Sequence, residues 1–256
     1  MSEITQPATG RRPIVTTDLR DGVGTLTLHR PDCRNAVDAV SVEALHTCLN
    51  ELIEDPTCRV IVVRGQGEVF CSGWDTRQFD VLRDLPGRAL EQVFERAREL
   101  LDALRDAPQV TIGAVQGAAL GFGLSLTAAC DLAVAARDAR FGLPEVRSGV
   151  VPAFVMLDIA RVLPSKQALD WLLTGELFDG EEALRGGLVS RLVDGDPAAE
   201  ADRIARDLAA RPAEQVSETK RCFTATRRGI THAAIEEAIR LSARMITGAD
   251  ELPPGR

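Results

Sequence analysis

The sequence predicts an α/β fold whose inner sheet is largely parallel. Strand-like and helix-like stretches alternate through the first half of the 256 residues, an order that is typical of βαβ crossovers. Hydrophobic residues make up 45% of the chain, which is enough for a sizeable core. From about Pro152 the pattern changes to short helices, so the C-terminal third is expected to be helical.

The spacing of apolar residues predicts the elements of the first half. Residues 24–29 alternate, with leucines on one face and threonines on the other, which is the period of a half-buried strand. Helical spacing follows at 41–55, and an apolar strand at 59–65. Residues 88–107 place one continuous set of apolar side chains on a single helical face: Leu90, Val93, Phe94, Ala97, Leu100, Leu101 and Leu104.

The middle of the chain predicts a strand, a glycine-containing turn, a buried helix and another strand. The first strand covers 110–117, the helix covers 124–130 and the second strand covers 131–136. Further on, residues 187–193 are strand-like. Three helices are then expected at 197–210, 213–228 and 231–247.

No linker-like composition or internal repeat divides the chain, so we expect one core with a helical extension. The core is placed at residues 1–195, and the polar leader at 1–12 is expected to be flexible. The helical region at 196–256 could pack on its own core or on a partner subunit.

Charge and cysteine usage limit the partners that the chain is expected to have. The net charge of -8 and the pI near 5.1 disfavour a nucleic-acid partner. The N-terminus lacks the apolar core of a signal peptide, and no run approaches the ~20 apolar residues of a membrane span. We therefore expect a cytoplasmic protein without a membrane partner. Reduced thiols and no metal are expected because the cysteines lack zinc-site spacing: Cys33, Cys48, Cys58, Cys71, Cys130 and Cys222.

The stretch ALGFGLSL, residues 119–126, predicts a sharp turn into a buried helix. Gly121 and Gly123 flank Phe122 and allow the backbone to come close to another group. No Ser, Thr, Asp or Asn stands at the expected cap, so the first amides of the helix lack a partner. Such amides can bind a ligand.

Two better-known glycine motifs do not fit this stretch. A dinucleotide fingerprint needs glycine where Leu126 stands, and a nucleophile elbow around Ser125 needs glycine where Thr127 stands. A hydrolase triad of Ser125, Asp194 and His232 has the chain order of one hydrolase fold, but order alone is a weak signal. We favour Ser125 as a small residue in a packed helix.

A second glycine turn occurs in FCSGWD, residues 70–75. Gly73 follows a predicted strand, and Asp75 can cap the helix after it. If the two preceding strands are neighbours, the amides of Trp74 and Phe122 could converge on one oxygen and polarise a carbonyl. Ordinary tight turns with two core aromatic residues are the alternative, and the residues alone favour that alternative.

A candidate acid/base lies in FGLPEVRSGVVP, residues 141–152. Glu145 follows Pro144 in apolar surroundings. A desolvated glutamate has a raised pKa and can exchange protons near neutrality. The same residue could instead complement the dipole of a short helix as a first-turn glutamate. The residues alone favour this structural role and leave the catalytic one open.

Several stretches resemble, in the same order along the chain, the signature segments of one family. LHRPDCRNAVD looks like an Arg-Pro-x-x-x-Asn-Ala segment, and VFCSGWD like a Phe-x-x-Gly-x-Asp turn. The long stretch from Val115 to Pro152 and LLTGELFDGEEALRGGLVSRLV resemble the segments that follow. The family is the enoyl-CoA hydratase/isomerase (crotonase) family, and the resemblance covers about residues 14–235. It implies a ClpP/crotonase-like spiral of βαβ units with a C-terminal helical trimerisation region, assembled as a homotrimer or homohexamer.

The resemblance also implies a site. The amides of Trp74 and Phe122 would hold the thioester oxygen of an acyl-CoA, and Glu145 would be the catalytic acid/base. Coenzyme A enters as part of the substrate, and no separate cofactor is implied. Arg34 and Arg77 would approach its phosphates. The full set of expected substrate-binding residues is Arg34, Ser72, Gly73, Asp75, Arg77, Gly121 and Ser125.

One departure from the family pattern bears on the reaction. Hydratases of the family use two glutamates, and Ser125 stands where the first of them would fall. A single base can take a proton from C2 of a 3-enoyl thioester and return it at C4, so isomerisation of the double bond is favoured. Atypical hydration and other enolate chemistry such as decarboxylation stay open. A catalytically weak acyl-CoA-binding protein is the alternative from another class.

Overall fold

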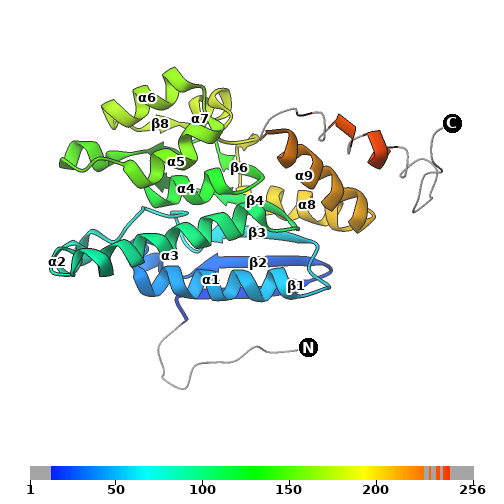
Figure 1. Ribbon diagram of the computed structural model, residues 1–256, viewed down its shortest axis with the longest axis horizontal. Helices are drawn as coiled ribbons and strands as arrows, with labels where there is room; N and C mark the ends of the chain where they lie inside the picture. Colours follow the sequence, from blue (N-terminus) through cyan, green and yellow to red (C-terminus); the bar gives the residue numbers. More distant parts are fainter. Residues whose placement is uncertain (1–12, 228–230, 232–234, 237–238, 243–256) are drawn as a thin grey trace. The chain divides into compact units, whose positions relative to one another are not determined.

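The computed structural model has an α/β fold built around a six-stranded sheet (Figure 1). It describes residues 13–227, 231, 235–236 and 239–242. Strand β1 pairs antiparallel with β2, and every later pair in this sheet is parallel. The predicted α/β class with a largely parallel inner sheet is confirmed. In spatial order the strands are β1 (Val15–Arg20), β2 (Val23–Leu28), β3 (Val60–Gly65), β4 (Val110–Val115), β6 (Leu132–Ala136) and β9 (Arg191–Val193).

A second sheet has three short strands. They lie in the order β5 (Ala118–Leu120), β7 (Arg140–Gly142) and β8 (Phe178–Asp179). Strand β5 pairs in parallel with β7, and β7 pairs antiparallel with β8. A single parallel bridge joins Cys71 to Ala119 and so links the segment after β3 to this second sheet.

Helices cover both faces of the main sheet, because the central strands are apolar on both sides. In β3, Ile61 and Val63 join the core cluster that also contains Leu26 of β2. The alternate residues Val60 and Val62 are equally buried and point to the opposite face. Helix α1 (Ala39–Glu54) packs on β1, β2 and α3 (Gly87–Asp106), whereas α8 (Pro197–Ala209) packs on β3, β4 and β6.

The remaining helices surround the second sheet or follow the core. Helix α4 (Phe122–Ala129) packs on β5, α3 and α5, and α5 packs on α6. Three short 3-10 helices occupy Pro31–Cys33, Thr76–Gln78 and Pro144–Ser148. The other α-helices are α2 (Phe79–Arg83), α5 (Ala153–Val162), α6 (Ser165–Thr174), α7 (Gly180–Gly186) and α9 (Ala213–Arg227).

Several predicted boundaries were wrong. Strands β1, β5, β7 and β8 were not predicted, because their two to six residues are too few or too polar for a clear period. The buried helix begins at Phe122 rather than at 124, and the strand expected at 187–193 is confined to Arg191–Val193. The helix expected at 231–247 lies mostly outside the described residues.

The chain divides into two compact units, Met1–Ala210 and Arg211–Arg256. The division between these units falls after α8, and the expected boundary at 195/196 between a core and an oligomerisation region stays a prediction. Helix α8 belongs with the core because Ala201, Ile204 and Ala205 are buried on its sheet-facing side and because Arg59 donates to the carbonyl of Ala209 at 3.0 Å. Helix α9 belongs to the second unit.

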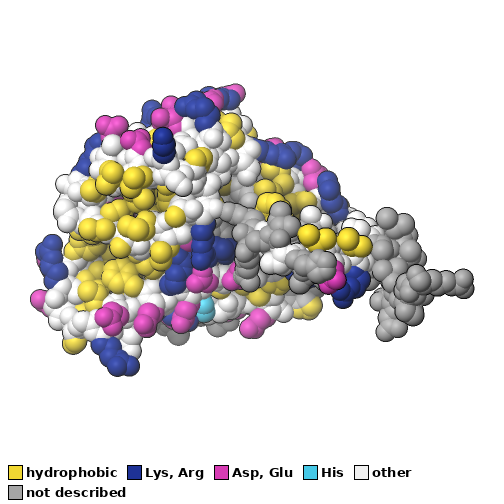
Figure 2. Space-filling model, turned by 45° about the horizontal axis from the view of Figure 1, so that its top comes forward, with side chains coloured by type: hydrophobic (Ala, Val, Ile, Leu, Met, Phe, Trp, Pro, Cys, Tyr) yellow, Lys and Arg dark blue, Asp and Glu magenta, His cyan; other side chains and the backbone are white. Residues whose placement is uncertain are grey.

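Exposed apolar side chains gather on the surface of the molecule (Figure 2). In the first unit, several of the large ones come from α5, α6 and the loops beside them, and this set is called the α5–α6 apolar surface: Val150, Val151, Leu157, Leu169, Leu173 and Leu177. Among the helices that the structure describes, none combines the length and the apolarity needed to cross a lipid bilayer.

One buried asparagine connects the segment after β2 to the segment after β3. The Asn35 side chain accepts a hydrogen bond from the Arg30 amide at 2.8 Å and donates to the carbonyls of Gln66 and Val69 at 2.9 and 2.7 Å. Its backbone φ of 53° lies in the left-handed region, which asparagine tolerates better than most residues do. These hydrogen bonds fix the segment that leads into the turn at Gly73.

We expect the substitution Asn35→Ala to lower the free energy of unfolding by about 3 kcal/mol, because the buried side chain loses three hydrogen bonds to partly buried backbone groups at once. Urea denaturation measures the change. The control is Asn50→Ala on α1, where one long contact to His46 at 3.3 Å is lost and a change of about 0.5 kcal/mol or less is expected. Equal effects of the two substitutions would contradict this role for Asn35.

Candidate active site

The two glycine turns lie side by side. The Cys71 amide donates to the carbonyl of Ala118 at 3.1 Å, and the Leu120 amide donates to the carbonyl of Cys71 at 3.0 Å. The amides of the two turns were expected to converge only if the strands before the turns are neighbours. This condition is met, because β3 pairs with β4. A Cβ added to Gly73 would lie 3.6 Å from the Phe122 nitrogen. The turn at Gly73 therefore reaches the start of α4.

The Trp74 amide points away from the strand-like segment at Val37. The carbonyl of Gly73 accepts a hydrogen bond from the Val37 amide at 2.9 Å. No peptide bond of the described chain is cis, so the N–H of Trp74 points opposite to that carbonyl. Glycine suits the position, because its φ of +95° is unfavourable for other residues and an added Cβ would come within 2.9 Å of the Leu120 carbonyl.

The Phe122 amide points out of the N-terminus of α4. Gly121 is the N-cap, and no side chain caps this end of the helix, as the sequence predicted. The Gly121 carbonyl accepts from the amides of Leu124 and Ser125 at 2.9 and 3.2 Å, so the N–H of Phe122 points the other way. Within the described part of the chain, neither the Trp74 amide nor the Phe122 amide donates to a protein acceptor.

The Glu145 carboxylate lies directly over Gly121. Glu145 belongs to the first turn of the 3-10 helix Pro144–Ser148, which is the structural position considered above, but its side chain reaches across to α4. Its Oε1 occupies the space that a Cβ on Gly121 would need. Its Oε2 is buried and has no hydrogen-bond partner among the residues that the structure describes. Burial raises the pKa of this carboxyl group, although its own backbone N–H partly opposes the shift.

Ser125 is a second buried polar group on the same helix face. It follows Gly121 by one turn, and side chains of a helix lean toward its N-terminus. Its side chain thus leans toward the end of α4 over which Glu145 lies. Ser125 is fully buried, and its Oγ has no hydrogen-bond partner in the described part of the chain. Two unsatisfied polar groups on one helix end are unusual in a protein interior.

The hydrolase interpretation of Ser125 finds no support. Its buried Oγ makes no hydrogen bond to any described residue. Asp194 is exposed instead, and it accepts a hydrogen bond from Arg137 Nε at 2.6 Å. His232, the third member of that arrangement, lies outside the described residues.

The other predicted binding residues lie around the Gly73 turn. Asp75 is almost fully buried and forms a two-pronged ion pair with Arg77 at 2.9 and 2.7 Å, which lowers the pKa of the Asp75 carboxyl group. The Arg77 guanidinium is otherwise exposed. Arg34 is exposed too, and its carbonyl accepts from the Ser72 amide at 3.1 Å. Asp75 therefore holds the turn, while both arginines face solvent.

Four aromatic rings pack together at the two turns, each in contact with two of the others, and we call them the ring cluster: Trp74, Phe94, Phe122 and Phe154. Trp74 lies edge-on to Phe122 with centroids 6.2 Å apart, and Phe122 stacks on Phe154 at 6.1 Å. The centroid of the Phe94 ring lies 5.8 Å from the centroids of both Trp74 and Phe154. The sequence analysis placed Phe94 on the core face of a helix and did not consider Phe154. No local pattern connects residues that are so far apart in the chain.

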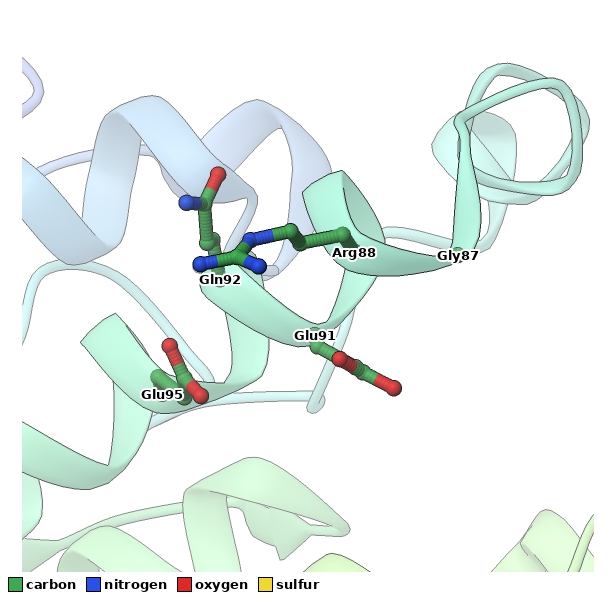
Figure 3. A pocket seen from close by; sticks show the side chains of 5 residues that line it. All are labelled: Gly87, Arg88, Glu91, Gln92 and Glu95. Carbon is green, nitrogen blue, oxygen red and sulfur yellow. The ribbon is translucent and has the colours of Figure 1, made fainter.

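A surface hollow of about 580 Å³ lies over the start of α3 (Figure 3). None of the predicted site residues lines it. Figure 3 shows the side chains of Arg88 and Gln92 close together, with Glu91 directed away from them. The hollow is lined by Gly87, Arg88, Glu91, Gln92 and Glu95. It is a polar feature of one helix surface and lacks the paired donors and the buried carboxylate of the site described above.

Comparison with known proteins places the chain among relatives of one kind. A model of the family described as "Enoyl-CoA hydratase/isomerase" matches residues 18–250. The chain is 36% identical over 163 residues to the "Probable enoyl-CoA hydratase" of Bacillus subtilis, covering 63% of this chain and 62% of that protein. It is 32% identical over 181 residues to the "Hydroxycinnamoyl-CoA hydratase-lyase" of Pseudomonas fluorescens, covering 70% and 66%. These matches span less than two thirds of each relative's own length.

Solved structures show the same likeness over nearly the whole chain. An enoyl-CoA hydratase of Mycobacterium smegmatis superposes with a TM-score of 0.84 at 31% identity and covers 92% of both chains. AtuE of Pseudomonas aeruginosa superposes with a TM-score of 0.86 at 31% identity and covers 93% of both chains. The fold that the sequence resemblance implied is therefore confirmed.

The substitution Gly121→Ala tests how tightly the site is packed. We expect it to lower the free energy of unfolding by about 3 kcal/mol, because alanine is strained at a φ of +50° and its Cβ would collide with the Glu145 carboxylate. Chemical denaturation measures the change. Gly87→Ala is the control, since no atom lies within 4 Å of its added Cβ and a neutral or slightly stabilising effect is expected. A neutral Gly121→Ala would contradict the described contact.

Proposed function

The chain belongs to the enoyl-CoA hydratase/isomerase family, and from this membership we propose that it transforms an acyl-CoA by stabilising the enolate of the thioester. The observation that supports this proposal most directly is the pair of amides at Trp74 and Phe122 on adjoining turns, both without a partner among the described residues, with the Glu145 carboxylate over the Gly121 turn. Backbone donors and a buried base in one place are what proton transfer beside a carbonyl requires.

The two amides would act on the thioester oxygen. Removing a proton from C2 moves negative charge onto that oxygen, and fixed N–H donors stabilise this charge without reorganising. Losing one such donor typically lowers a rate by ~10²–10³. The turn at Gly73 is held by Val37 on one side and reaches α4 on the other, so its amide would keep its direction during the reaction.

Glu145 would serve as the only carboxylate acid/base, and this favours isomerisation. In a 3-enoyl thioester, Glu145 would take the proton from C2, the electrons would spread to C4 through the enolate, and the same carboxyl group would return the proton at C4. The product is the conjugated 2-enoyl thioester. No second base is needed, which agrees with Ser125 at the place of the other glutamate of hydratases.

Hydration is the second candidate, and one observation favours it. The buried Ser125 Oγ lacks a partner and leans toward the carboxylate, so the two groups could hold a water between them. That water would add its oxygen to C3 of a 2-enoyl thioester while its proton goes to C2. Decarboxylation would use the same amides without this water.

Binding of the coenzyme and assembly complete the proposal. The exposed guanidinium groups of Arg34 and Arg77 would meet the coenzyme phosphates, although Asp75 already neutralises part of the charge of Arg77. A homotrimer or homohexamer would cover part of the exposed apolar surface, of which the α5–α6 apolar surface is a large share.

Kinetics with two substrates separate the candidate reactions. Wild type is expected to convert a 3-enoyl-CoA to its conjugated isomer, and Glu145→Gln to lower kcat by ~10²–10⁴ because the acid/base is lost. Ser125→Ala is expected to keep isomerisation within a few-fold, and exposed Glu91→Gln is the matched control. Absorbance of the conjugated thioester follows the reaction.

A different outcome would select hydration: only a 2-enoyl-CoA loses its conjugated absorbance in the presence of the wild-type protein, and Ser125→Ala prevents this loss. Binding without any turnover would select the weak acyl-CoA binder.

The pH dependence of isomerisation should report the Glu145 carboxyl group. The base must be ionised in the free enzyme, so kcat/KM is expected to fall as pH decreases through the pKa of Glu145. Burial raises this pKa above its ordinary value of 4.5, so the midpoint should lie at higher pH than that value. A midpoint at or below 4.5 would contradict the desolvated base.

A further inference from the structure

The ring cluster is a concentration of aromatic side chains in a chain that has few of them. The whole sequence contains eight Phe, two Trp and no Tyr, and three of these Phe and one of these Trp meet here. They come from four separate segments: the turn after β3, and helices α3, α4 and α5. Packing of a general core does not require rings to gather in this way, since most of the core is Leu, Val and Ala.

The position of the ring cluster connects it to the reacting group. Trp74 and Phe122 carry both a ring of the cluster and one of the two donor amides. A thioester held by those amides would therefore lie within about one side-chain length of the rings. The acyl group starts at the same carbonyl carbon, so the rings form a wall close to its first carbons. This step rests on the proposed function.

The exposed part of the cluster is an aromatic surface, and the cation that lies over one of its rings is paired. The Phe94 side chain is 39% exposed, Trp74 and Phe154 are partly exposed, and Phe122 is buried behind them. The Arg98 guanidinium lies 5.8 Å over the Phe154 ring, but Arg98 Nη1 donates to the buried Asp158 at 2.9 Å, so its charge is compensated. The wall thus offers ring faces and edges to an acyl group.

We propose that the ring cluster makes this protein selective for acyl groups that carry a planar aromatic ring over unbranched alkyl chains of the same reach. A planar ring can stack on, or meet edge-on, the exposed rings over its whole area, whereas a staggered alkyl chain touches a flat surface only in part. Aromatic pairs gain attraction beyond the area that they bury. Phe94 and Phe154 are the specificity-determining residues that do not also supply a donor amide.

Binding of two saturated thioesters tests the proposal without any turnover. The probes are 4-phenylbutanoyl-CoA and octanoyl-CoA, whose acyl groups reach about equally far from the thioester. Isothermal titration calorimetry on the wild-type protein should give a Kd for the phenyl compound about fivefold lower than for octanoyl-CoA, as expected for added aromatic contacts. An equal or tighter affinity for octanoyl-CoA, or no binding of either compound, would overturn the proposal.

Leucine variants assign the preference to the rings. Phe94→Leu and Phe154→Leu keep an apolar side chain but remove a ring, and each should bring the affinity ratio close to one. Phe223→Leu, which removes an exposed ring of α9 in the other unit, is the matched control and should leave the ratio at about fivefold. An unchanged ratio in both Phe94→Leu and Phe154→Leu would overturn the proposal. Neither probe reacts, so the two proposals can fail separately. If the protein prefers the phenyl compound but has no isomerase activity, the proposed reaction is contradicted and the proposed aromatic selectivity is not.

Discussion

The parallel bridge between Cys71 and Ala119 is the contact on which the site depends. Its two hydrogen bonds, at 3.1 and 3.0 Å, join the segment after β3 to the strand before α4, and this junction brings the two glycine turns together. On its other side the same segment is bound to Val37, which donates to the Gly73 carbonyl and accepts from the Asp75 amide at 2.7 Å. The turn is therefore held from both sides. Fixed donors of this kind stabilise developing charge because they do not have to reorient when it forms.

Two polar groups of the site lack hydrogen-bond partners among the described residues, whereas two polar side chains that hold the neighbouring turn are satisfied. Asn35 makes three side-chain hydrogen bonds to the backbone, and Asp75 is held by Arg77 and Arg30. In contrast, Glu145 Oε2 and Ser125 Oγ are buried without partners. Buried polar groups without partners reduce stability, so their presence at one helix end is best explained by a function that provides the missing partner. The raised pKa of Glu145 has the same origin, because burial disfavours its charged form.

The sequence predicted the parts of this structure that depend on local patterns. Apolar runs placed β3, β4 and β6, and the glycines around Phe122 and before Trp74 indicated the two turns. Donor amides carry no side-chain signature, so the residues alone raised their convergence only as the less favoured alternative, and the family resemblance was needed to prefer it. Strands as short as β5 have no measurable period. The ring cluster could not be predicted, because Phe94 and Phe154 meet only through the packing of α3 and α5 on α4. Helix α8 has the composition of a surface helix and yet packs on the sheet, so its place in the first compact unit could not be predicted from a local pattern.

The most direct test concerns the thioester oxygen itself. Infrared difference spectroscopy of octanoyl-CoA, with and without ¹³C at the thioester carbonyl, reports how strongly that oxygen is hydrogen-bonded when the compound binds to the wild-type protein. If the amides of Trp74 and Phe122 both donate to it, the carbonyl stretch will lie at lower frequency in the complex than in water. A carbonyl frequency equal to or higher than that in water, with the thioester fully bound, would contradict the account.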